Sequence, residues 1–148
     1  MNRITMISLG VKNMKASLKF YKDIGFKTFE TKDNPPIVFF DNLGSRLALY
    51  SLEGLARDIN EENPPKLAGD AFGGITLACN VKTEQEVDEM MALAESKGAT
   101  IVKRPQKVFW GGYSGYFRDP NGHYWEVAYG PYFEYDENGM LKVDNLVE

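Results

Sequence analysis

The sequence predicts an α+β fold in which two β-α-β-β-β repeats form paired, curved, mixed sheets with their helices outside. Three observations support this fold class. Strand-like alternation and helical spacing follow each other in the same order twice along the chain. A glycine stands where each predicted helix ends, at Gly25 and at Gly98. A short polar turn separates the last two predicted strands of each half, at 41–44 and 119–122.

The first repeat is expected over residues 4–51. A strand over 4–11 precedes a helix that begins at the N-cap candidate Asn13 and ends at Gly25. Three further strands are expected, at 26–31, 37–40 and 46–51. Residues 52–72 are interpreted as a linker with at most a short helix, because they contain prolines and several charges.

The second repeat is expected over residues 73–130. Its first strand covers 74–81, and Thr83 with Glu86 has the spacing of a capping box at the start of a helix. A strand over 100–103 follows, and then a hairpin whose second strand covers 124–129. The tail, residues 131–148, contains Asn138-Gly139, which predicts another hairpin. Together these parts make one domain over 1–148.

The two repeats also match position by position. Val81 follows Val11 by 70 residues, and an offset of 78 matches Phe39, Asp41 and Gly44 with Phe117, Asp119 and Gly122. Alternation along the strands then gives each sheet two faces. The apolar face, expected beneath the helices, comprises Ile7, Leu9, Val11, Leu47, Leu49, Ile75, Leu77, Val81, Trp125 and Val127. The smaller and more polar face, expected to line a cavity, comprises Met6, Ser8, Gly10, Ala48, Tyr50, Thr76, Ala78, Asn80, Tyr124, Glu126 and Ala128.

Composition limits the partners and the compartment. The 148 residues carry a net charge of -4 with no basic stripe, so we expect no nucleic-acid partner. No apolar run is long enough to span a bilayer, and the N-terminus lacks a signal-peptide pattern, so we expect a cytoplasmic protein without a membrane partner. The single cysteine, Cys79, permits no internal disulfide and is interpreted as a small buried hydrophobe.

The repeated element order, the opening LGVKNMKASLKFYKDIGF and the closing FRDPNGHYWEV resemble the vicinal oxygen chelate superfamily, the glyoxalase, bleomycin-resistance and extradiol-dioxygenase group. The resemblance covers residues 4–130 and implies the glyoxalase/bleomycin resistance fold and a homodimer. Many members hold a divalent metal with one side chain from each of four strands. The corresponding positions here are Met6, Ala48, Thr76 and Glu126, and only Glu126 is a usual ligand. We therefore expect no metal and no other cofactor.

Glu126 is the candidate catalytic residue, because it is a carboxylate in the middle of an otherwise apolar strand. It is either an acid or base for a bound ligand or a hydrogen-bonded residue without a catalytic role. The candidate ligand-binding residues are Tyr50, Asn80, Trp110, Tyr113, Tyr116 and Tyr124. Trp110, Tyr113 and Tyr116 are expected in or beside a glycine-rich loop that closes over a pocket, or else at the edge of the core or a dimer interface. The sole histidine, His123, is interpreted as a turn or rim residue.

The leading functional hypothesis is a protein that binds a small organic molecule in an aromatic cup beside Glu126 without the usual metal. If it is an enzyme, an isomerase- or lyase-like step with Glu126 as acid or base is expected. The alternatives are a drug-sequestering protein of the bleomycin-resistance type, and a metal-dependent enzyme similar to lactoylglutathione lyase with replaced ligands. A structural or regulatory partner with an empty cup is the remaining hypothesis.

Overall fold

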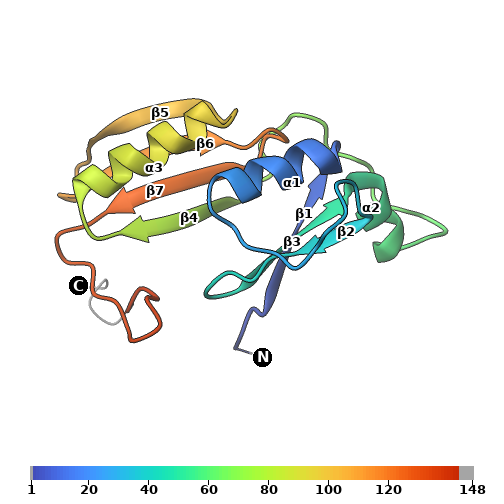
Figure 1. Ribbon diagram of the computed structural model, residues 1–148, viewed down its shortest axis with the longest axis horizontal. Helices are drawn as coiled ribbons and strands as arrows, with labels where there is room; N and C mark the ends of the chain where they lie inside the picture. Colours follow the sequence, from blue (N-terminus) through green and yellow to red (C-terminus); the bar gives the residue numbers. More distant parts are fainter. Residues whose placement is uncertain (1, 144–148) are drawn as a thin grey trace. The chain divides into compact units, whose positions relative to one another are not determined.

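A computed structural model describes residues 2–143 of the chain (Figure 1). The chain divides into two compact units at the boundary between Ile75 and Thr76. Each unit contains one mixed β-sheet with a long helix packed on one face, which confirms the predicted α+β class. No helix within residues 2–143 has the length and apolarity that crossing a bilayer requires.

The first unit has a three-stranded sheet in the order β1-β3-β2, with β1 parallel and β2 antiparallel to β3. The α1 helix begins after Asn13, whose side chain accepts a hydrogen bond from the Ala16 N–H, and Gly25 follows it with φ +112°. Both predicted helix limits are therefore confirmed. The elements are β1 (Met6–Val11), α1 (Met14–Asp23), β2 (Ile37–Phe39), β3 (Arg46–Ser51) and α2 (Leu52–Ile59).

The core of the first unit lies between α1 and the sheet. Tyr21 of α1 is fully buried, and its ring centroid lies 5.3 Å from that of Phe26 and 5.6 Å from that of Phe40. Of the sheet residues expected beneath the helix, Leu9, Val11, Leu47 and Leu49 are buried there, and Ile7 is half-buried. The apolar face predicted for this repeat is thus confirmed.

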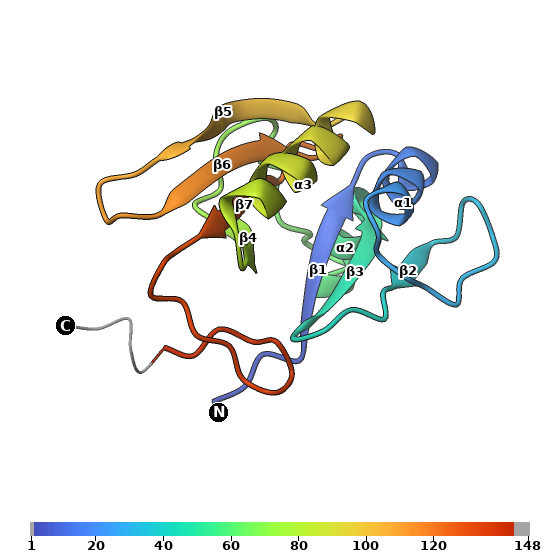
Figure 2. The same ribbon diagram turned by 60° about the vertical axis from the view of Figure 1, so that its left-hand side comes forward.

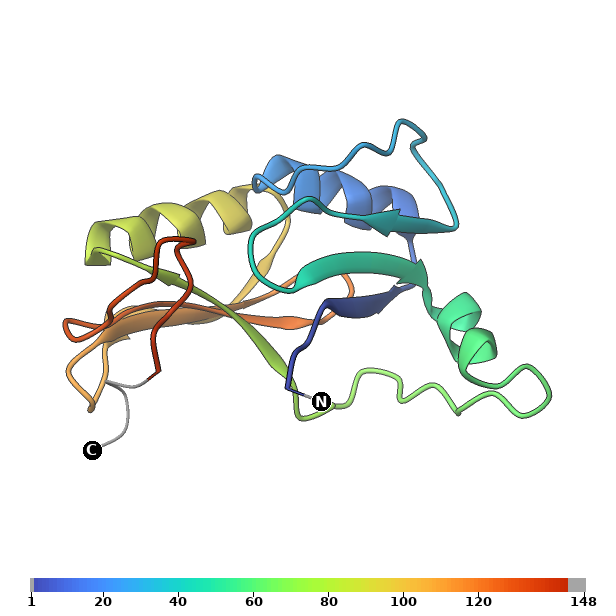
Figure 3. The ribbon, with the colours of Figure 1, turned by 90° about the horizontal axis from the view of Figure 1, so that it is seen from below.

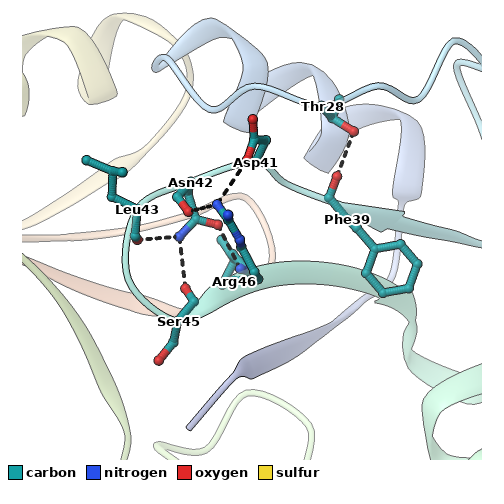
Figure 4. Close-up of polar contacts among 8 residues, drawn as sticks. Thr28, Phe39, Asp41, Asn42, Leu43, Ser45 and Arg46 are labelled. Carbon is teal, nitrogen blue, oxygen red and sulfur yellow. Dashed lines mark hydrogen bonds and ion pairs between the residues drawn. The ribbon is translucent and has the colours of Figure 1, made fainter. Parts of the chain in front are cut away.

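The strand predicted over 26–31 does not form. This segment still runs beside the end of β2, because the Asp41 N–H donates to the Lys27 carbonyl. The Thr28 hydroxyl also donates to the Phe39 carbonyl (Figure 4). Two prolines directly precede β2, at 35 and 36, and they supply no N–H groups for a longer ladder. The first repeat therefore has three strands in its sheet where four were expected.

The predicted turn over 41–44 is held by its own side chains (Figure 4). Asn42 Oδ1 accepts a hydrogen bond from the Leu47 N–H at 2.8 Å, and Asn42 Nδ2 donates to the Ser45 carbonyl at 2.9 Å. Arg46 forms an ion pair with Asp41 at 3.0 Å. These contacts connect β2 to β3 and set the register between them.

The α2 helix packs on the face of the sheet that α1 leaves uncovered. It follows β3 directly along the chain (Figure 3). A side chain at Gly10 would come within 2.5 Å of Leu52, and one at Gly54 would come within 2.9 Å of the Tyr50 ring. Gly10 and Gly54 thus permit the close approach of α2. This end of the face that was predicted to line a cavity is therefore covered.

The second unit has a four-stranded sheet in the order β4-β7-β6-β5, with α3 along one face (Figure 2). The predicted capping box is confirmed, because the Thr83 hydroxyl accepts from the Glu86 N–H and the Glu86 carboxylate accepts from the Thr83 N–H. Gly98 follows the helix with φ +104°. The elements are β4 (Thr76–Val81), α3 (Glu84–Ser96), β5 (Thr100–Lys107), β6 (Tyr113–Arg118) and β7 (Tyr124–Tyr129).

The β5 strand extends four residues beyond its predicted end and contains Pro105. An edge strand tolerates proline because one side of its backbone has no ladder partner. The register between β5 and β6 shifts on both sides of Lys103. A side chain at Gly115 of β6 would lie within 3.1 Å of the Pro105 nitrogen, so glycine permits this close pairing.

Ile75 precedes β4 and is 71% exposed, so its predicted place beneath the helix is wrong.

The strand registers of the two units correspond closely. Ser8 lies opposite Ala48, and Ala78 lies opposite Glu126, as the offsets of 70 and 78 require. The predicted match of Phe39 with Phe117 is wrong, however, because the residue opposite Ala48 is Phe39 whereas the residue opposite Glu126 is Tyr116. The connection between the last two strands is one residue longer in the second unit, and one residue moves a side chain to the other face.

The tail returns toward the second sheet after β7. Tyr135 forms a bridge with Leu141 around Asn138-Gly139, which confirms the predicted hairpin. The Tyr135 hydroxyl donates to the Val81 carbonyl at 2.9 Å. This bond anchors the hairpin to the end of β4. Residues 144–148 of the predicted tail lie outside the described part of the chain.

Candidate functional site

Glu126 lies in the middle of the second sheet, between Ala78 on β4 and Tyr116 on β6. Its neighbours in β7, Trp125 and Val127, are buried on the opposite side. Glu126 therefore belongs to the face that α3 does not cover. We call this surface the Glu126 face, and its residues are Thr76, Ala78, Asn80, Lys103, Ser114, Tyr116, Arg118, Tyr124, Glu126 and Ala128.

Tyr116 is the direct partner of Glu126 on this face. Burial raises the pKa of the Tyr116 phenol above its ordinary value, and the hydrogen bond and negative charge of Glu126 raise it further. The phenol therefore stays protonated at neutral pH and lies directly opposite the carboxylate as a potential donor. A bond from such a donor would restrain the orientation of the carboxylate, which an acid or base needs before it can act on a bound ligand.

Two cationic side chains also lie on the Glu126 face. Lys103 Nζ is 5.7 Å from the centroid of the Tyr116 ring, and the Arg118 guanidinium carbon is 5.9 Å from that of Tyr124. Both pairs are direct neighbours across adjacent strands, so each cation shares the face of its ring. Neither Lys103 nor Arg118 was among the ligand-binding residues predicted from the sequence.

An aromatic pair closes one end of the Glu126 face. The rings of Trp110 and Phe133 are stacked, with centroids 5.8 Å apart and planes at 20°. A side chain at Gly112 would overlap the Trp110 ring, and one at Gly130 would meet the Phe133 ring at 2.7 Å. Gly112 and Gly130 continue the alternation of β6 and β7, which places both rings over the Glu126 face.

Tyr113 does not join this group. It begins β6 and lies three residues before Tyr116, so the two rings point to opposite faces of the sheet. The Tyr113 hydroxyl donates to Asp88 of α3 at 2.9 Å, and this hydrogen bond is the main cause of its raised pKa. Tyr113 and Tyr116 thus lie in β6, beside the loop that contains Trp110, and pairing with β7 directs their rings to opposite faces of the sheet.

The remaining predicted site residues lie in both units. Asn80 and Tyr124 are on the Glu126 face, one alternation step from the level of Glu126. Tyr50 belongs to the first unit, where it lies beside α2. Phe133 was missed, because its position depends on the path of the tail. The one local signal was Gly130, directly after the predicted strand, because a glycine there lets the Phe133 ring approach the backbone closely.

The metal ligands of the resemblance do not fit this chain. Of the four positions, Glu126 alone offers a carboxylate or imidazole, and Met6, Ala48 and Thr76 do not replace the other three. Within residues 2–143, no three histidine, cysteine, aspartate or glutamate side chains are grouped to hold a metal ion. The sole histidine, His123, lies in the turn before β7, where its backbone N–H donates to the Asp119 carboxylate. The donor chemistry therefore does not support a chelated metal.

The family model for the Glyoxalase/Bleomycin resistance protein/Dioxygenase superfamily matches residues 3–127. The chain belongs to this superfamily, as the duplicated strand registers and the closing hairpin also indicate. A search of curated proteins gave no match. The solved structures supply the more detailed comparison.

Three solved structures illustrate the similarity. A glyoxalase-related enzyme from Fulvimarina pelagi is 28% identical, with a TM-score of 0.83 over 96% of this chain and 98% of that chain. A glyoxalase/bleomycin resistance protein/dioxygenase family enzyme from Burkholderia phytofirmans PsJN is 20% identical, with a TM-score of 0.71 over 86% and 98%. Lactoylglutathione lyase from Agrobacterium tumefaciens is 23% identical, with a TM-score of 0.64 over 88% and 95%. The latter two support the fold alone.

Proposed function

We propose that this protein binds a small organic molecule on the Glu126 face and that Glu126 transfers a proton to or from it. The observation that carries the proposal is the position of Glu126, a carboxylate at the centre of a sheet face that α3 does not cover. Tyr116 supports it, because its neutral hydroxyl belongs to the residue directly opposite Glu126 and is available as a donor to the carboxylate. The similarity to a glyoxalase-related enzyme is a further reason to favour catalysis over binding alone.

The chemistry that suits this arrangement is an isomerase- or lyase-like step. A Glu126 oxygen removes a proton from a carbon next to a carbonyl group, and the electron pair of that C–H bond moves into an enolate. Return of the proton to a neighbouring atom gives an isomer. Loss of a leaving group from the adjacent carbon gives an elimination product. Both routes balance without an oxidant, a reductant or a metal.

The proposal also covers the cofactor, the compartment and the oligomeric state. The protein acts without a divalent metal, because three of the four family positions carry no suitable donor. It is a cytoplasmic homodimer, as the resemblance and the sequence suggest. A drug-sequestering role with a cationic ligand is disfavoured, because Lys103 and Arg118 place two positive charges on the Glu126 face.

The test begins with a thermal-shift screen of small carbonyl compounds on the untagged protein, since a ligand that binds the folded state raises the melting temperature. Each stabilising compound is then incubated in D₂O, and exchange of its acidic C–H is followed by proton NMR. We expect Glu126→Gln to slow exchange by about 10²–10⁴-fold, the usual contribution of a general base, while the ligand still binds.

The matched control is Glu89→Gln, which changes an exposed carboxylate on α3. It should leave both binding and exchange unchanged. Exchange at the parent rate in Glu126→Gln would refute the role of Glu126. Exchange that depends on added nickel or zinc and disappears with a chelator would instead support the metal-dependent alternative.

A further inference from the structure

The Glu126 face carries more positive than negative charge. Glu126 is its single carboxylate, whereas Lys103 and Arg118 are both cationic. We propose that these two side chains bind an oxyanion of the ligand, so that the substrate is an organic anion, a carboxylate or a phosphate ester, with its acidic C–H beside Glu126. This inference rests on the function proposed above and specifies the class of its substrate.

The three charged residues surround Tyr116. Lys103 lies directly opposite Tyr116 on β5, and Glu126 lies directly opposite it on β7. Lys103 and Glu126 are therefore two strand spacings apart, about 10 Å between Cα atoms. Arg118 is two residues along β6 from Tyr116, about 7–8 Å diagonally from each of the other two. A small anion lying over the Tyr116 ring would thus reach all three side chains.

The two cations are held in place but not neutralised. Each lies over a tyrosine ring, at 5.7 Å for Lys103 and 5.9 Å for Arg118. Among residues 2–143, neither has a carboxylate within the 4.0 Å of an ion pair. Cations held by rings in this way keep their charge available to a ligand and lose little side-chain freedom when the ligand binds.

Other basic side chains of the second unit show the contrast. Arg104 donates to both carboxylate oxygens of Glu95, at 2.6 and 2.7 Å. Lys107 pairs with Glu84 and lies 5.8 Å from the Tyr113 ring, on the side of α3. The β5 and β6 strands therefore contain two Lys–Tyr pairs on opposite faces. Of these two, only the pair on the Glu126 face lacks a carboxylate partner for its lysine.

The bound oxyanion would also favour the proposed chemistry. When Glu126 takes the proton, negative charge develops on the enolate oxygen of the substrate. The charges of Lys103 and Arg118 then stabilise the transition state as well as the bound substrate. They also hold the substrate so that its acidic carbon faces Glu126.

The test titrates the whole protein with inorganic phosphate and with benzoate, at an ionic strength kept constant with sodium chloride. Melting temperature reports binding, and benzyltrimethylammonium serves as a cation of similar size to benzoate. Both anions should stabilise the parent protein and the cation should not. Lys103→Gln and Arg118→Gln should each weaken anion binding roughly three- to tenfold, and Glu126→Gln should strengthen it roughly two- to tenfold because a like charge is removed.

Lys107→Gln is the control, because it changes the lysine of the matched pair on the other face. An equal loss of binding in this variant, or none in Lys103→Gln and Arg118→Gln, would overturn the inference. Preference for the cation would also overturn it. Glu126-dependent proton exchange in neutral compounds without anion binding would refute the inference alone. Anion binding without any Glu126-dependent exchange would leave the binding site in place and refute the proposed catalysis.

Discussion

Replacing Gly112 with alanine should displace Trp110 from the end of the Glu126 face. A methyl group at position 112 would overlap the six-membered part of the Trp110 ring, far inside the 3.4 Å at which ordinary contact begins. The indole must therefore move, and it can do so because its side chain is 39% exposed. Movement separates it from Phe133, on which it is stacked.

The energetic cost has a lower and an upper bound. If only the stack with Phe133 is lost, the cost is about 0.5–1.5 kcal/mol. If the whole ring is released to solvent, about 150 Å² of surface is exposed, which costs about 4 kcal/mol at about 25 cal/mol per Å². Alanine restricts the unfolded chain and returns about 0.4–1 kcal/mol. The net loss therefore runs from near zero to about 3 kcal/mol.

Tryptophan emission is the sharper assay, because a loss of stability near the lower bound would hardly change the melting temperature. The second tryptophan, Trp125, is 9% exposed and stacked on Phe117, so its signal should stay constant. We expect Gly112→Ala to shift the emission to the red and to increase quenching by acrylamide. Phe133→Ala should produce the same change by removing the partner ring.

Gly73→Ala is the matched control, because its backbone is not left-handed and nothing lies within 4 Å of the added methyl. It should leave the emission unchanged. An unchanged spectrum for Gly112→Ala and Phe133→Ala would refute the stacking of Trp110 over Gly112. It would also remove the aromatic pair as the boundary of the Glu126 face.

Two further predictions follow from titration. Burial first, and then Glu126, raises the pKa of Tyr116, so its stabilising contribution is complete below the ordinary pKa of tyrosine and is lost as the pH rises through the raised value. The titration of this phenol is obtained by subtracting the alkaline absorbance curve of Tyr116→Phe from that of the parent protein. Glu126→Gln should move this transition to lower pH. An unmoved transition would contradict the effect of Glu126 on the Tyr116 pKa. Burial, with a smaller effect of Glu86, raises the pKa of the Cys79 thiol, so iodoacetamide at pH 8 should modify it more slowly in the folded protein than in urea. Equal rates would show that the thiol is not protected.

Local signals in the sequence predicted the helices and the last strand of each repeat well. Asn13, Thr83 and the glycines that follow the helices act through bonds or dihedral angles within a few residues, so their effect is visible without tertiary structure. The prediction of a strand over 26–31 was wrong, because a strand needs a neighbouring strand with free N–H groups. The segment beside it begins with two prolines before β2, and prolines have no backbone N–H to donate. The extra length of β5 depends in the same way on β6.

The candidate site was predicted only as far as alternation along single strands allows. Alternation placed Asn80, Tyr124 and Glu126 on one face, and the structure agrees. It could not place Lys103, because irregular pairing between β5 and β6 decides which ring this side chain meets. It could not find Phe133 either, because the tail brings that ring back to Gly130 without any periodic pattern.

The two repeats differ at the positions that would carry the chemistry. Ala48 and Glu126 occupy the same register, and so do their partners Phe39 and Tyr116. Ala48 is fully buried and has no group that could exchange a proton. Under the proposed function, one carboxylate must therefore both remove the proton and return it, or release it with a leaving group. A reaction of that kind requires a single correctly oriented base, and Tyr116, directly opposite Glu126, is the side chain placed to orient the one that the second repeat retains.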